Sequence, residues 1–571
     1  MLGLMQDMPL LISSLLDYAE RWHPQTEIVS RDADGGEHRY GYAAAAARAR
    51  RLASALQGAG VRPGDRVATL AMNHHRHFEL YFGVSGMGAV LHTVNPRLFA
   101  QQIEYIVDHG GSRILFVDPA FASMIAPLAP ALRQVVRYVV LAGPDGMDET
   151  CRSLPGAVDY ESFLAAGRDG FDWPSFDERS ASTLCYTSGT TGNPKGVLYS
   201  HRSTVLHALS ACQPGSFDIS AESALLAVPP MFHANAWSFP YLAAMTGAKL
   251  VLPGAKIDGE SLQALIATEG CTFTVGVPTI FTMLLDHLRR SGGSLAPLSR
   301  AGIGGSAVPR AMIEELARHG CTVLQLWGMT ETSPLGTIAT PTPAVAALPE
   351  PERNDVLAQQ GRIRWGLEAR IVREDGSEAP RDGRSPGALW VRGPWVAQGY
   401  FCGEPSVLDA EGWFPTGDVA TLDARGYLRI TDRTKDVIKS GGEWISSLEI
   451  ENLACSVPGV RQAAVIAAYH PKWEERPLLI IVPDADRPAT REEVLDHLRP
   501  RIAKWWLPDD VVSVEALPMT ATGKISKLAL RERFRDHLVR TGEPVGCGPV
   551  GEFQPSSSRS SASEPGPNLA R

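Results

Sequence analysis

The feature that most constrains the fold and function of this chain is a loop rich in glycine and hydroxyl groups. It lies between two apolar runs. The loop reads Thr187-Ser-Gly-Thr-Thr-Gly-Asn-Pro-Lys-Gly196 and joins the runs 183–186 and 197–199. Glycine lets backbone N–H groups turn toward a ligand, the hydroxyls add donors and Lys195 adds a cation, which together suit a polyphosphate. The spacing is not that of a P-loop, in which lysine directly follows glycine. A flexible linker is the alternative, but the flanking apolar runs favour a strand–loop–strand unit that binds phosphate.

Length, charge and cysteine content narrow the class of protein. A chain of 571 residues is too long for one hydrophobic core, so two or more domains are expected. The net charge of -9 argues against a nucleic-acid partner. The eight cysteines are scattered without a C-x-x-C pair, which indicates reduced thiols in a cytoplasmic protein and gives no zinc signature.

The apolar stretch near the N-terminus predicts a helix and not a membrane span. Residues 8–16 are apolar but are followed by charged residues, and no run in the chain reaches the length of a transmembrane segment. The spacing of Leu11, Leu15, Ala19 and Trp22 places them on one face of an amphipathic helix.

Helix and strand patterns alternate between residues 40 and 145. A helix is expected at 43–56, and short apolar strands are expected at 66–71, 114–117, 138–141 and 249–252. Such alternation predicts largely parallel sheets covered by helices.

Beyond residue 432 the pattern changes to a smaller unit, with strands at 463–467, 478–482 and 511–514 and a helix at 491–503. The predicted fold class is therefore mixed α/β, with a large N-terminal domain (1–432) of helix-covered sheets and a small, mobile C-terminal α+β domain (433–541). A tail rich in glycine, serine and proline (542–571) should be disordered.

The segment His74-His-Arg-His77 has the composition of a metal site but not its geometry. Arg76 would repel a cation, and the spacing does not bring all three histidines to one helical face. We therefore expect the start of a surface helix here.

Six further clusters carry chemistry that fits a nucleotide, although each is weak when taken singly. They are Met231-Phe-His-Ala-Asn-Ala-Trp237, Gly304-Gly-Ser-Ala307, Trp327-Gly-Met-Thr-Glu331, Thr416-Gly-Asp418, the lysine-bearing segment 432–445 and Pro518-Met-Thr-Ala-Thr-Gly-Lys524.

Taken together and in this order, these motifs closely resemble the adenylate-forming superfamily of acyl-CoA synthetases, luciferases and amino-acid adenylation domains. The resemblance covers roughly residues 10 to 540. The segments 232–237 and 439–447 are most similar to medium- and long-chain fatty acyl-CoA synthetases, and 200–203 is similar to bacterial medium-chain enzymes and 3-methylthiopropionate–CoA ligases.

The resemblance implies a two-step reaction that uses ATP, Mg²⁺ and coenzyme A. A carboxylate attacks the α-phosphate of ATP to give an acyl-adenylate and pyrophosphate, and the thiol of coenzyme A then displaces AMP. In the family pattern Thr187 and Glu331 hold Mg²⁺, and the loop residues with Lys195 bind the β- and γ-phosphates. The loop residues are Ser188, Gly189, Thr190, Thr191 and Gly192. The residues expected around adenine, ribose and the α-phosphate are Gly305, Gln325, Trp327, Gly328, Thr330, Asp418, Arg433, Lys435 and Lys439.

The resemblance also assigns roles to the C-terminal motifs. Lys524 is expected to bridge the attacking carboxylate and the α-phosphate, although a solvated surface lysine is the alternative. Rotation of the small domain about a hinge at Lys435 would then bring a coenzyme A tunnel to the site. The tunnel residues are expected to be Gly441, Gly442 and Trp444.

Two residues in the 231–237 motif have both a structural and a functional interpretation. His233 is either a packed core histidine or a catalytic polar contact beside the reacting carboxylate, and Trp237 is either core or the gate of the acyl tunnel. Amino-acid adenylation domains carry an aspartate where this chain has His233, so an uncharged acyl group is expected, with an apolar wall from 274–285 and Ile303.

The sequence thus predicts an ATP-dependent acyl-CoA ligase for a medium- or long-chain fatty acid. A 3-methylthiopropionate or other short-chain carboxylate ligase is the alternative within the class. A non-catalytic acyl-nucleotide sensor is a third, disfavoured because Lys524 and Glu331 are both present. The oligomeric state is left open, with a homodimer as one alternative.

Overall fold

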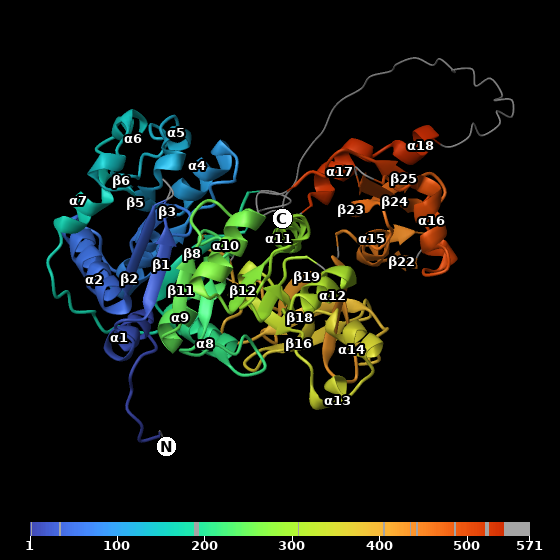
Figure 1. The fold of residues 1–571 in the computed structure, drawn as a ribbon, viewed down its shortest axis with the longest axis horizontal. Coiled ribbons are helices and arrows are strands. Elements are labelled where there is room, and N and C mark those ends of the chain that lie inside the picture. Colours follow the sequence, from blue (N-terminus) through green and yellow to red (C-terminus); the bar gives the residue numbers. More distant parts are fainter. Residues whose placement is uncertain are drawn as a thin grey trace, which may run out of the picture.

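Two large sheets with helices packed between them form the N-terminal part of the molecule (Figure 1). The computed structural model describes residues 1, 3–32, 36–187, 193–306, 308–403, 406–433, 435–440, 443–484, 487–519 and 525–541. The predicted mixed α/β class is confirmed.

The first sheet has the order β7-β6-β5-β3-β4-β8-β9 and is parallel except for β9, which pairs antiparallel with β8. Its strands are β3 (Arg66–Leu70), β4 (Val90–Thr93), β5 (Ser112–Val117), β6 (Arg137–Val140), β7 (Val158–Asp159), β8 (Ala181–Tyr186) and β9 (Gly196–Ser200). The three strands predicted in this region are confirmed to within about two residues at each end. Their side chains are mostly buried on both faces, as is usual for parallel strands covered by helices.

The second sheet has the order β17-β18-β19-β20-β16-β15-β14-β13-β12-β10-β11-β1-β2. Its central parallel strands are β1 (Glu27–Arg31), β10 (Ala224–Leu226), β11 (Lys249–Leu252), β12 (Phe273–Gly276), β13 (Arg300–Ile303) and β14 (Thr322–Gly328). Its antiparallel strands are β2 (Glu37–Gly41), β15 (Leu335–Ile338), β16 (Gly361–Ile363), β17 (Glu368–Val372), β18 (Gly387–Arg392), β19 (Phe414–Leu422) and β20 (Tyr427–Arg433).

The largest core lies where helices meet both sheets. It joins residues of α1 (Ile12–Trp22), α2 (Tyr42–Gly58), α3 (His75–Gly86), α8 (His201–Cys212) and α9 (Phe239–Thr246) to residues of β3, β5, β10, β11 and β12. The other helices of this part are α4 (Ala100–His109), α5 (Ala122–Ile125), α6 (Glu149–Ser153), α7 (Tyr160–Ala165), α10 (Gly259–Glu269), α11 (Pro278–Ser291), α12 (Arg310–Arg318), α13 (Pro343–Ala346) and α14 (Glu350–Leu357).

The N-terminal amphipathic helix exists, but its predicted face is only partly right. Leu11, Leu15 and Ala19 are buried, whereas Trp22 is 66% exposed. Trp22 is the last residue of α1, so its side chain projects past the end of the packed face. Among the described residues, no helix is both long and apolar enough to span a membrane.

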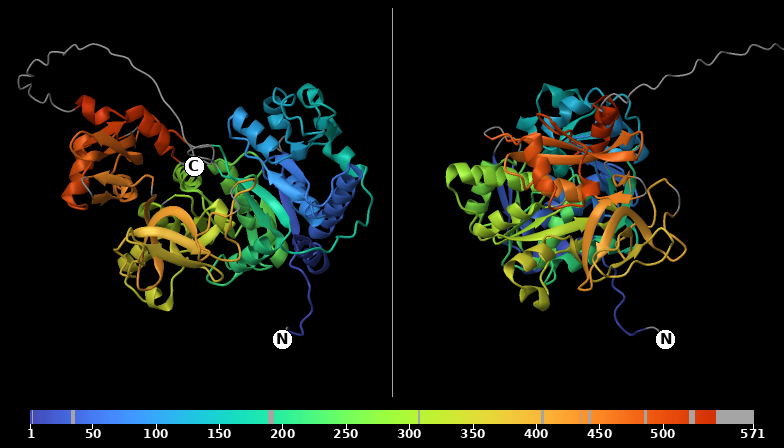
Figure 2. Two further views of the ribbon diagram at one scale, coloured as in Figure 1. Left: turned by 180° about the vertical axis from the view of Figure 1, so that it is seen from behind. Right: turned by 90° about the vertical axis from the view of Figure 1, so that its right-hand side faces the viewer.

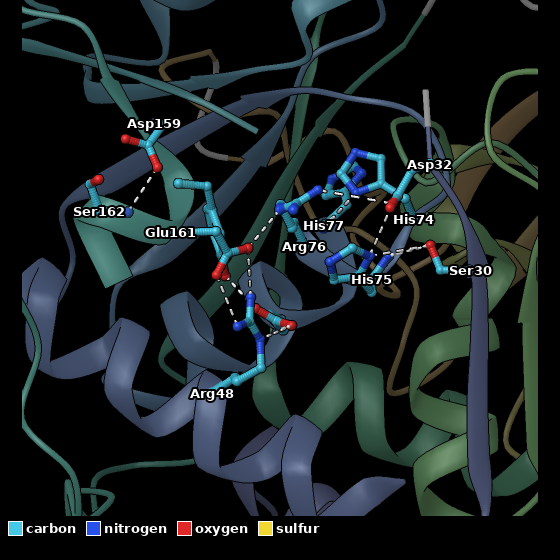
Figure 3. A network of polar contacts seen from close by, with 12 residues as sticks. Ser30, Asp32, Arg48, His74, His75, Arg76, His77, Asp159, Glu161 and Ser162 are labelled. Carbon is cyan, nitrogen blue, oxygen red and sulfur yellow. Dashed lines mark hydrogen bonds and ion pairs between the residues drawn. The ribbon is translucent and has the colours of Figure 1, made fainter. Parts of the chain in front are cut away.

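The prediction that His74–His77 begins a surface helix is wrong in one respect. A helix does begin here, but His74, His75 and His77 in its first turn are buried. His74 pairs with Asp118 at 2.7 Å, and Arg76 pairs with Glu161 at 2.9 Å, as Figure 3 shows for Arg76. The polar groups of this turn are accommodated by partners from other segments, which the local sequence could not indicate.

The C-terminal part contains a third sheet, of order β22-β21-β24-β23 with β25 paired to β24, set to one side of the larger part (Figure 2). Its strands are β21 (Ile438–Ser440), β22 (Glu443–Ile445), β23 (Val460–His470), β24 (Glu474–Pro483) and β25 (Asp510–Ser513). Its helices are α15 (Ser447–Ala454), α16 (Arg491–Leu498), α17 (Lys527–Phe534) and α18 (His537–Thr541). The helix predicted at 491–503 stops at Leu498. Arg499 still has helical φ and ψ, but Pro500 has no N–H with which to continue the helical hydrogen bonds.

Candidate active site

The predicted phosphate loop is closed at its base by two hydrogen bonds. The backbone N–H of Thr187 donates to the carbonyl of Lys195 at 2.9 Å, and the N–H of Lys195 donates to Oγ1 of Thr187 at 3.2 Å. The loop therefore joins β8 to β9, as the apolar runs predicted. The intervening candidates Ser188, Gly189, Thr190, Thr191 and Gly192 lie outside the described residues.

The turn that carries Glu331 follows β14 and is held from two sides. The carboxylate of Glu331 is buried, and its Oε1 accepts a hydrogen bond from the hydroxyl of Tyr400 at 2.8 Å. The hydroxyl of Tyr199, on β9, donates to the carbonyl of Thr330 at 2.6 Å. Burial raises the pKa of Glu331, and the Tyr400 hydrogen bond and the charge of Arg433 oppose that rise.

Three of the predicted nucleotide-binding residues meet at the ends of β14 and β20 and the middle of β19. The indole N–H of Trp327 donates to Oδ2 of Asp418 at 2.8 Å, and Nε of Arg433 lies 3.5 Å from Oδ1 of the same carboxylate. Asp418 and Arg433 are also paired in register across β19 and β20. The sequence motifs that contain these residues are therefore brought together by the sheet.

Glycine is required at Gly328 and Gly305. A Cβ on Gly328 would lie 2.0 Å from the carbonyl oxygen of Pro334, a distance that no real side chain adopts. Gly305 has a φ of +86°, in the region that favours glycine. Both glycines were predicted to border the nucleotide; Gly328 allows close backbone packing, and Gly305 allows a left-handed turn.

Gln325, one of the residues predicted to border the nucleotide, has a buried side-chain amide without hydrogen-bond partners in the described part of the chain. Its side chain is 1% exposed, and neither Nε2 nor Oε1 has a hydrogen-bond partner among the described residues. A buried amide left without partners costs about 1–3 kcal/mol. Such a group is explained if a bound ligand or an ordered water completes its hydrogen bonds.

The motif that carries His233 and Trp237 forms a left-handed turn. The five residues Ala234 to Ser238 all have positive φ, between 35° and 65°, although none of them is glycine. A left-handed conformation costs a non-glycine residue about 1–2 kcal/mol. Trp237 is half-buried, and its ring lies 3.4 Å from where a Cβ on Gly304 would be. The strain is concentrated on the proposed acyl gate.

Two side chains that the sequence analysis did not single out hold this turn in place. Asn235 donates to Oγ1 of Thr183 at 2.5 Å and accepts from Thr93 at 3.2 Å, which ties the turn to β8 and β4. His207 lies 2.8 Å from Oγ of Ser238. The only local signal for Asn235 was an amide in an otherwise apolar motif.

His207 connects the left-handed turn to the segment after Glu331. Its Nε2 accepts a hydrogen bond from the backbone N–H of Leu335 at 3.0 Å, so its Nδ1–H is the donor to Ser238. Burial lowers the pKa of His207 to about 3. The imidazole is therefore neutral at physiological pH.

The C-terminal candidates are only partly described. Lys435 lies at the surface between β20 and β21. Partial loss of solvent around its ammonium, together with the charge of Arg433, lowers its pKa. The backbone N–H of Lys439 donates to Glu475 at 2.8 Å. Lys524, Gly441 and Gly442 lie outside the described residues, as does the side chain of Trp444.

A cluster of aromatic and basic side chains lies next to the predicted tunnel, and the sequence analysis missed it. Arg476 lies over the ring of Trp505 at 4.9 Å, and Trp473 packs edge-on against Trp505 at 4.7 Å. Nη1 of Arg476 is also 3.4 Å from Oγ of Ser440, the residue before Gly441. The recurrence of lysine–tryptophan pairs at 472–473 and 504–505 was the available signal.

The donors predicted for Mg²⁺ suit that ion. Thr187 and Glu331 supply a hydroxyl and a carboxylate oxygen, and Mg²⁺ is usually bound by one or two carboxylates together with substrate phosphates. The buried Glu331 carboxylate, already held through Oε1, has the character of such a ligand. When bound, the ion would neutralise charge on the phosphates of ATP.

The described groups are those expected of an adenylate-forming enzyme. They are a loop that is closed at its base and predicted to bind phosphate, a buried carboxylate, and a tryptophan–aspartate–arginine set on the second sheet. The family model described as AMP-binding enzyme matches residues 16–401, and that of the AMP-binding enzyme C-terminal domain matches residues 449–524. The chain therefore belongs to the AMP-binding enzyme family.

Individual relatives match along nearly their whole length. A 3-methylmercaptopropionyl-CoA ligase of Ruegeria pomeroyi is 50% identical, covering 94% of this chain and 100% of the relative. A medium-chain-fatty-acid–CoA ligase of Ectopseudomonas oleovorans is 46% identical, covering 95% and 100%. The crystal structure of the anthranilate CoA ligase AuaEII with anthranoyl-AMP matches with a TM-score of 0.82 at 22% identity, over 94% of this chain and 100% of that one, which supports the fold.

Proposed function

We propose that this acyl-CoA ligase activates a medium- or long-chain fatty acid with ATP and Mg²⁺ and transfers the acyl group to coenzyme A. The observation that carries the proposal is the convergence of the Thr187 loop, at the β8–β9 edge of the first sheet, with buried Glu331 and the Trp327–Asp418–Arg433 set of the second sheet. A hydrogen bond from Tyr199, on β9, to the turn that carries Glu331 joins the two sheets at this point, and Tyr400 bonds to Glu331. Such a convergence suits a nucleoside triphosphate, which needs cations and donors at one end and an aromatic and hydroxyl-binding surface at the other.

In the first step the chain's own groups stabilise charge at the phosphates. The Thr187 loop and Lys195 bind the β- and γ-phosphates, and Thr330 donates toward the α-phosphate. Lys524 neutralises the carboxylate and the α-phosphate as they approach one another. Asp418 holds the ribose hydroxyls as an acceptor, with its orientation set by Trp327.

In the second step the small domain rotates about Lys435 and places coenzyme A at the acyl-adenylate. The division at 432/433 is supported by the end of β20 at Arg433 and the start of a separate sheet at Ile438. The glycines 441–442 and Trp444 then line the pantetheine tunnel. The rings of Trp473 and Trp505 beside Ser440 supply surface for stacking, and Arg476, which is buried and paired with Asp509, holds Trp505 in place.

The apolar residues that follow β12, near Gly304 and Trp237, suit an uncharged acyl chain. Residues 276–280 are half-buried at the carboxyl end of β12, and the N–H of Gly304 donates to the carbonyl of Gly276 at 3.1 Å. Phe281, Leu284 and Ile303 are packed in the core behind them. A second candidate substrate, 3-methylmercaptopropionate, is favoured by the 50% identity to a ligase of that name.

The proposal also includes a cytoplasmic location and, as an alternative to a monomer, a homodimer. The described cysteines are all free, which is usual in a reducing compartment. Leu4, Met5 and Met8 are exposed on the N-terminal arm, which provides apolar surface for a second copy. Light scattering of the purified chain decides between monomer and dimer.

The test is a pyrophosphate- and AMP-release assay over carboxylic acids from propionate to stearate, with 3-methylmercaptopropionate, in the presence and absence of coenzyme A. Without coenzyme A, about one equivalent of pyrophosphate per enzyme is expected, because the acyl-adenylate remains bound. Turnover should require coenzyme A.

Glu331→Gln should lose this activity, and Glu314→Gln, at an exposed position on α12, serves as the matched control. Release of pyrophosphate that does not depend on any acid would refute the proposal.

A further inference from the structure

The segment 395–401 contacts both halves of the proposed metal–triphosphate site. The N–H of Ala397 donates to the carbonyl of Glu331 at 2.8 Å, and the N–H of Phe401 donates to the carbonyl of Gly196 at 2.8 Å. Oγ of Ser333 donates to the carbonyl of Trp395, also at 2.8 Å. One short segment is therefore bonded to the Glu331 turn and to the end of the phosphate loop.

Tyr400 is the side chain of this segment that reaches functional groups on both sides. Its hydroxyl donates to Oε1 of Glu331, and its ring lies under the ammonium of Lys195, with Nζ 4.7 Å from the ring centroid. The ring also packs against the small core formed by Cys185, Val197 and Tyr199. That core fixes the ring, so both contacts start from a rigid support.

We propose that Tyr400 is a positioning residue that couples the carboxylate of Glu331 to Lys195. Its hydroxyl bonds to Oε1 and would leave Oε2 to act as a ligand when Mg²⁺ is bound, and its ring face holds the Lys195 ammonium at the end of the predicted phosphate loop. The inference rests on the proposed function, because it concerns how the same site binds Mg·ATP. In this proposal Tyr400 acts through Glu331 and Lys195 and is not itself a ligand of the nucleotide or the metal.

The two contacts can be separated by two substitutions. Tyr400→Phe removes only the hydroxyl and keeps the ring under Lys195, whereas Tyr400→Leu removes both. Calorimetric titration of ATP, with Mg²⁺ and with EDTA, measures binding independently of turnover. Tyr138→Phe is the matched control, because the Tyr138 hydroxyl has no hydrogen-bond partner in the described part of the chain.

For Tyr400→Phe we expect the Mg²⁺ concentration at half-saturation to rise about tenfold or more, the loss typical of a hydrogen bond to a charged group. Binding of ATP in EDTA should stay within about twofold of the wild type, because the cation–π contact is retained. Tyr400→Leu should weaken binding in EDTA as well. The KM for the carboxylic acid should not change in Tyr400→Phe.

A double mutant distinguishes positioning from packing. In a Glu331→Gln background, adding Tyr400→Phe should produce little further change in the Mg²⁺ dependence, because the carboxylate that the hydroxyl orients is gone. Additive losses would overturn the proposal, as would an unchanged Mg²⁺ dependence in Tyr400→Phe. Equal losses in EDTA for Tyr400→Phe and Tyr400→Leu would also overturn it.

Failure of the Tyr400 proposal can be distinguished from failure of the proposed function. If the wild type binds Mg·ATP but releases no pyrophosphate with any acid, the ligase assignment fails and the calorimetric test of Tyr400 still stands. If the wild type turns over and Tyr400→Phe matches it in every binding measurement, the role of Tyr400 fails alone. Circular dichroism and thermal unfolding verify that each variant is folded.

Discussion

Single residues at this site are oriented by partners from distant parts of the chain. Trp327 and Asp418 are 91 positions apart and share a hydrogen bond, and Glu331 and Tyr400 are 69 positions apart and share another. Each pair joins a group proposed to contact the nucleotide or metal to a side chain that fixes its direction. Loss of the partner should therefore weaken function without removing the functional group itself.

Lys524 is the residue at which a single substitution should separate the two half-reactions. Lys524→Ala should abolish formation of the acyl-adenylate, because no cation then neutralises the carboxylate and the α-phosphate. Thioester formation from supplied acyl-adenylate and coenzyme A should be spared. Pyrophosphate release and thioester formation are measured separately, with Lys504→Ala as a control. Equal loss of both half-reactions would contradict the assignment.

The element that carries most strain is the left-handed turn of residues 234–238. Its conformation is opposed by each residue's own preference and is maintained by Asn235, His207 and the helices around it. Asparagine is one of the few residues that tolerates this conformation, which explains its place in the turn.

Asn235→Ala should destabilise the fold by about 2–3 kcal/mol, because Thr183 loses a buried partner and the left-handed backbone loses a tolerant residue. Urea unfolding monitored by fluorescence measures the change. Asn354→Ala in α14 should change stability by less than about 0.5 kcal/mol. A loss at Asn235 no greater than the loss at Asn354 would show that the side chain does not hold the turn.

Because of His207, on α8, the free energy of unfolding should decrease as the pH becomes acidic. The folded-state pKa of about 3 lies below the unfolded value of 6.5, so the unfolded chain takes up the extra proton as pH falls. The stabilisation is complete above pH 6.5 and decreases from there toward pH 3, by about 2 kcal/mol at pH 5.

His207→Gln should flatten this dependence. The free energy of unfolding, measured in urea from pH 8 to pH 5, should fall by about 2 kcal/mol less than in the wild type. His319→Gln, at the end of α12, is the control. An unaltered pH dependence in His207→Gln would contradict the neutral, buried state.

At the scale of the whole molecule, the two parts meet along β20 and α15. Ser446 donates through Oγ to the carbonyl of Thr431, and the N–H of Ser447 donates to Asp432 at 2.7 Å. Lys527 is paired with Glu451 at 2.7 Å, and burial raises the pKa of Asp432. The bonds of Ser446 and Ser447 to β20 define one arrangement of the small domain, and the proposed second step requires another.

Lys435→Pro should slow thioester formation more than adenylation, because proline fixes φ at the position where the backbone is proposed to rotate. The two half-reactions are followed by rapid quench. Lys435→Ala removes the charge but leaves the backbone free to rotate. It should therefore affect adenylation and thioester formation alike. An equal slowing of both steps by proline would place the hinge elsewhere.

The sequence by itself determined which segments form strands and which residues are candidates for the active site. The strand–loop–strand unit of β8 and β9 and the buried apolar strands follow from local composition and periodicity. The motifs predicted to bind the nucleotide follow from the family resemblance, and the structure brings Trp327, Asp418 and Arg433 together. Only the tertiary structure decided the burial of His74–His77, the left-handed turn at Trp237 and the contacts of Tyr400. Burial and orientation depend on which surfaces meet when sheets and helices pack. Local sequence cannot predict this, because the contacting residues are far apart in the chain.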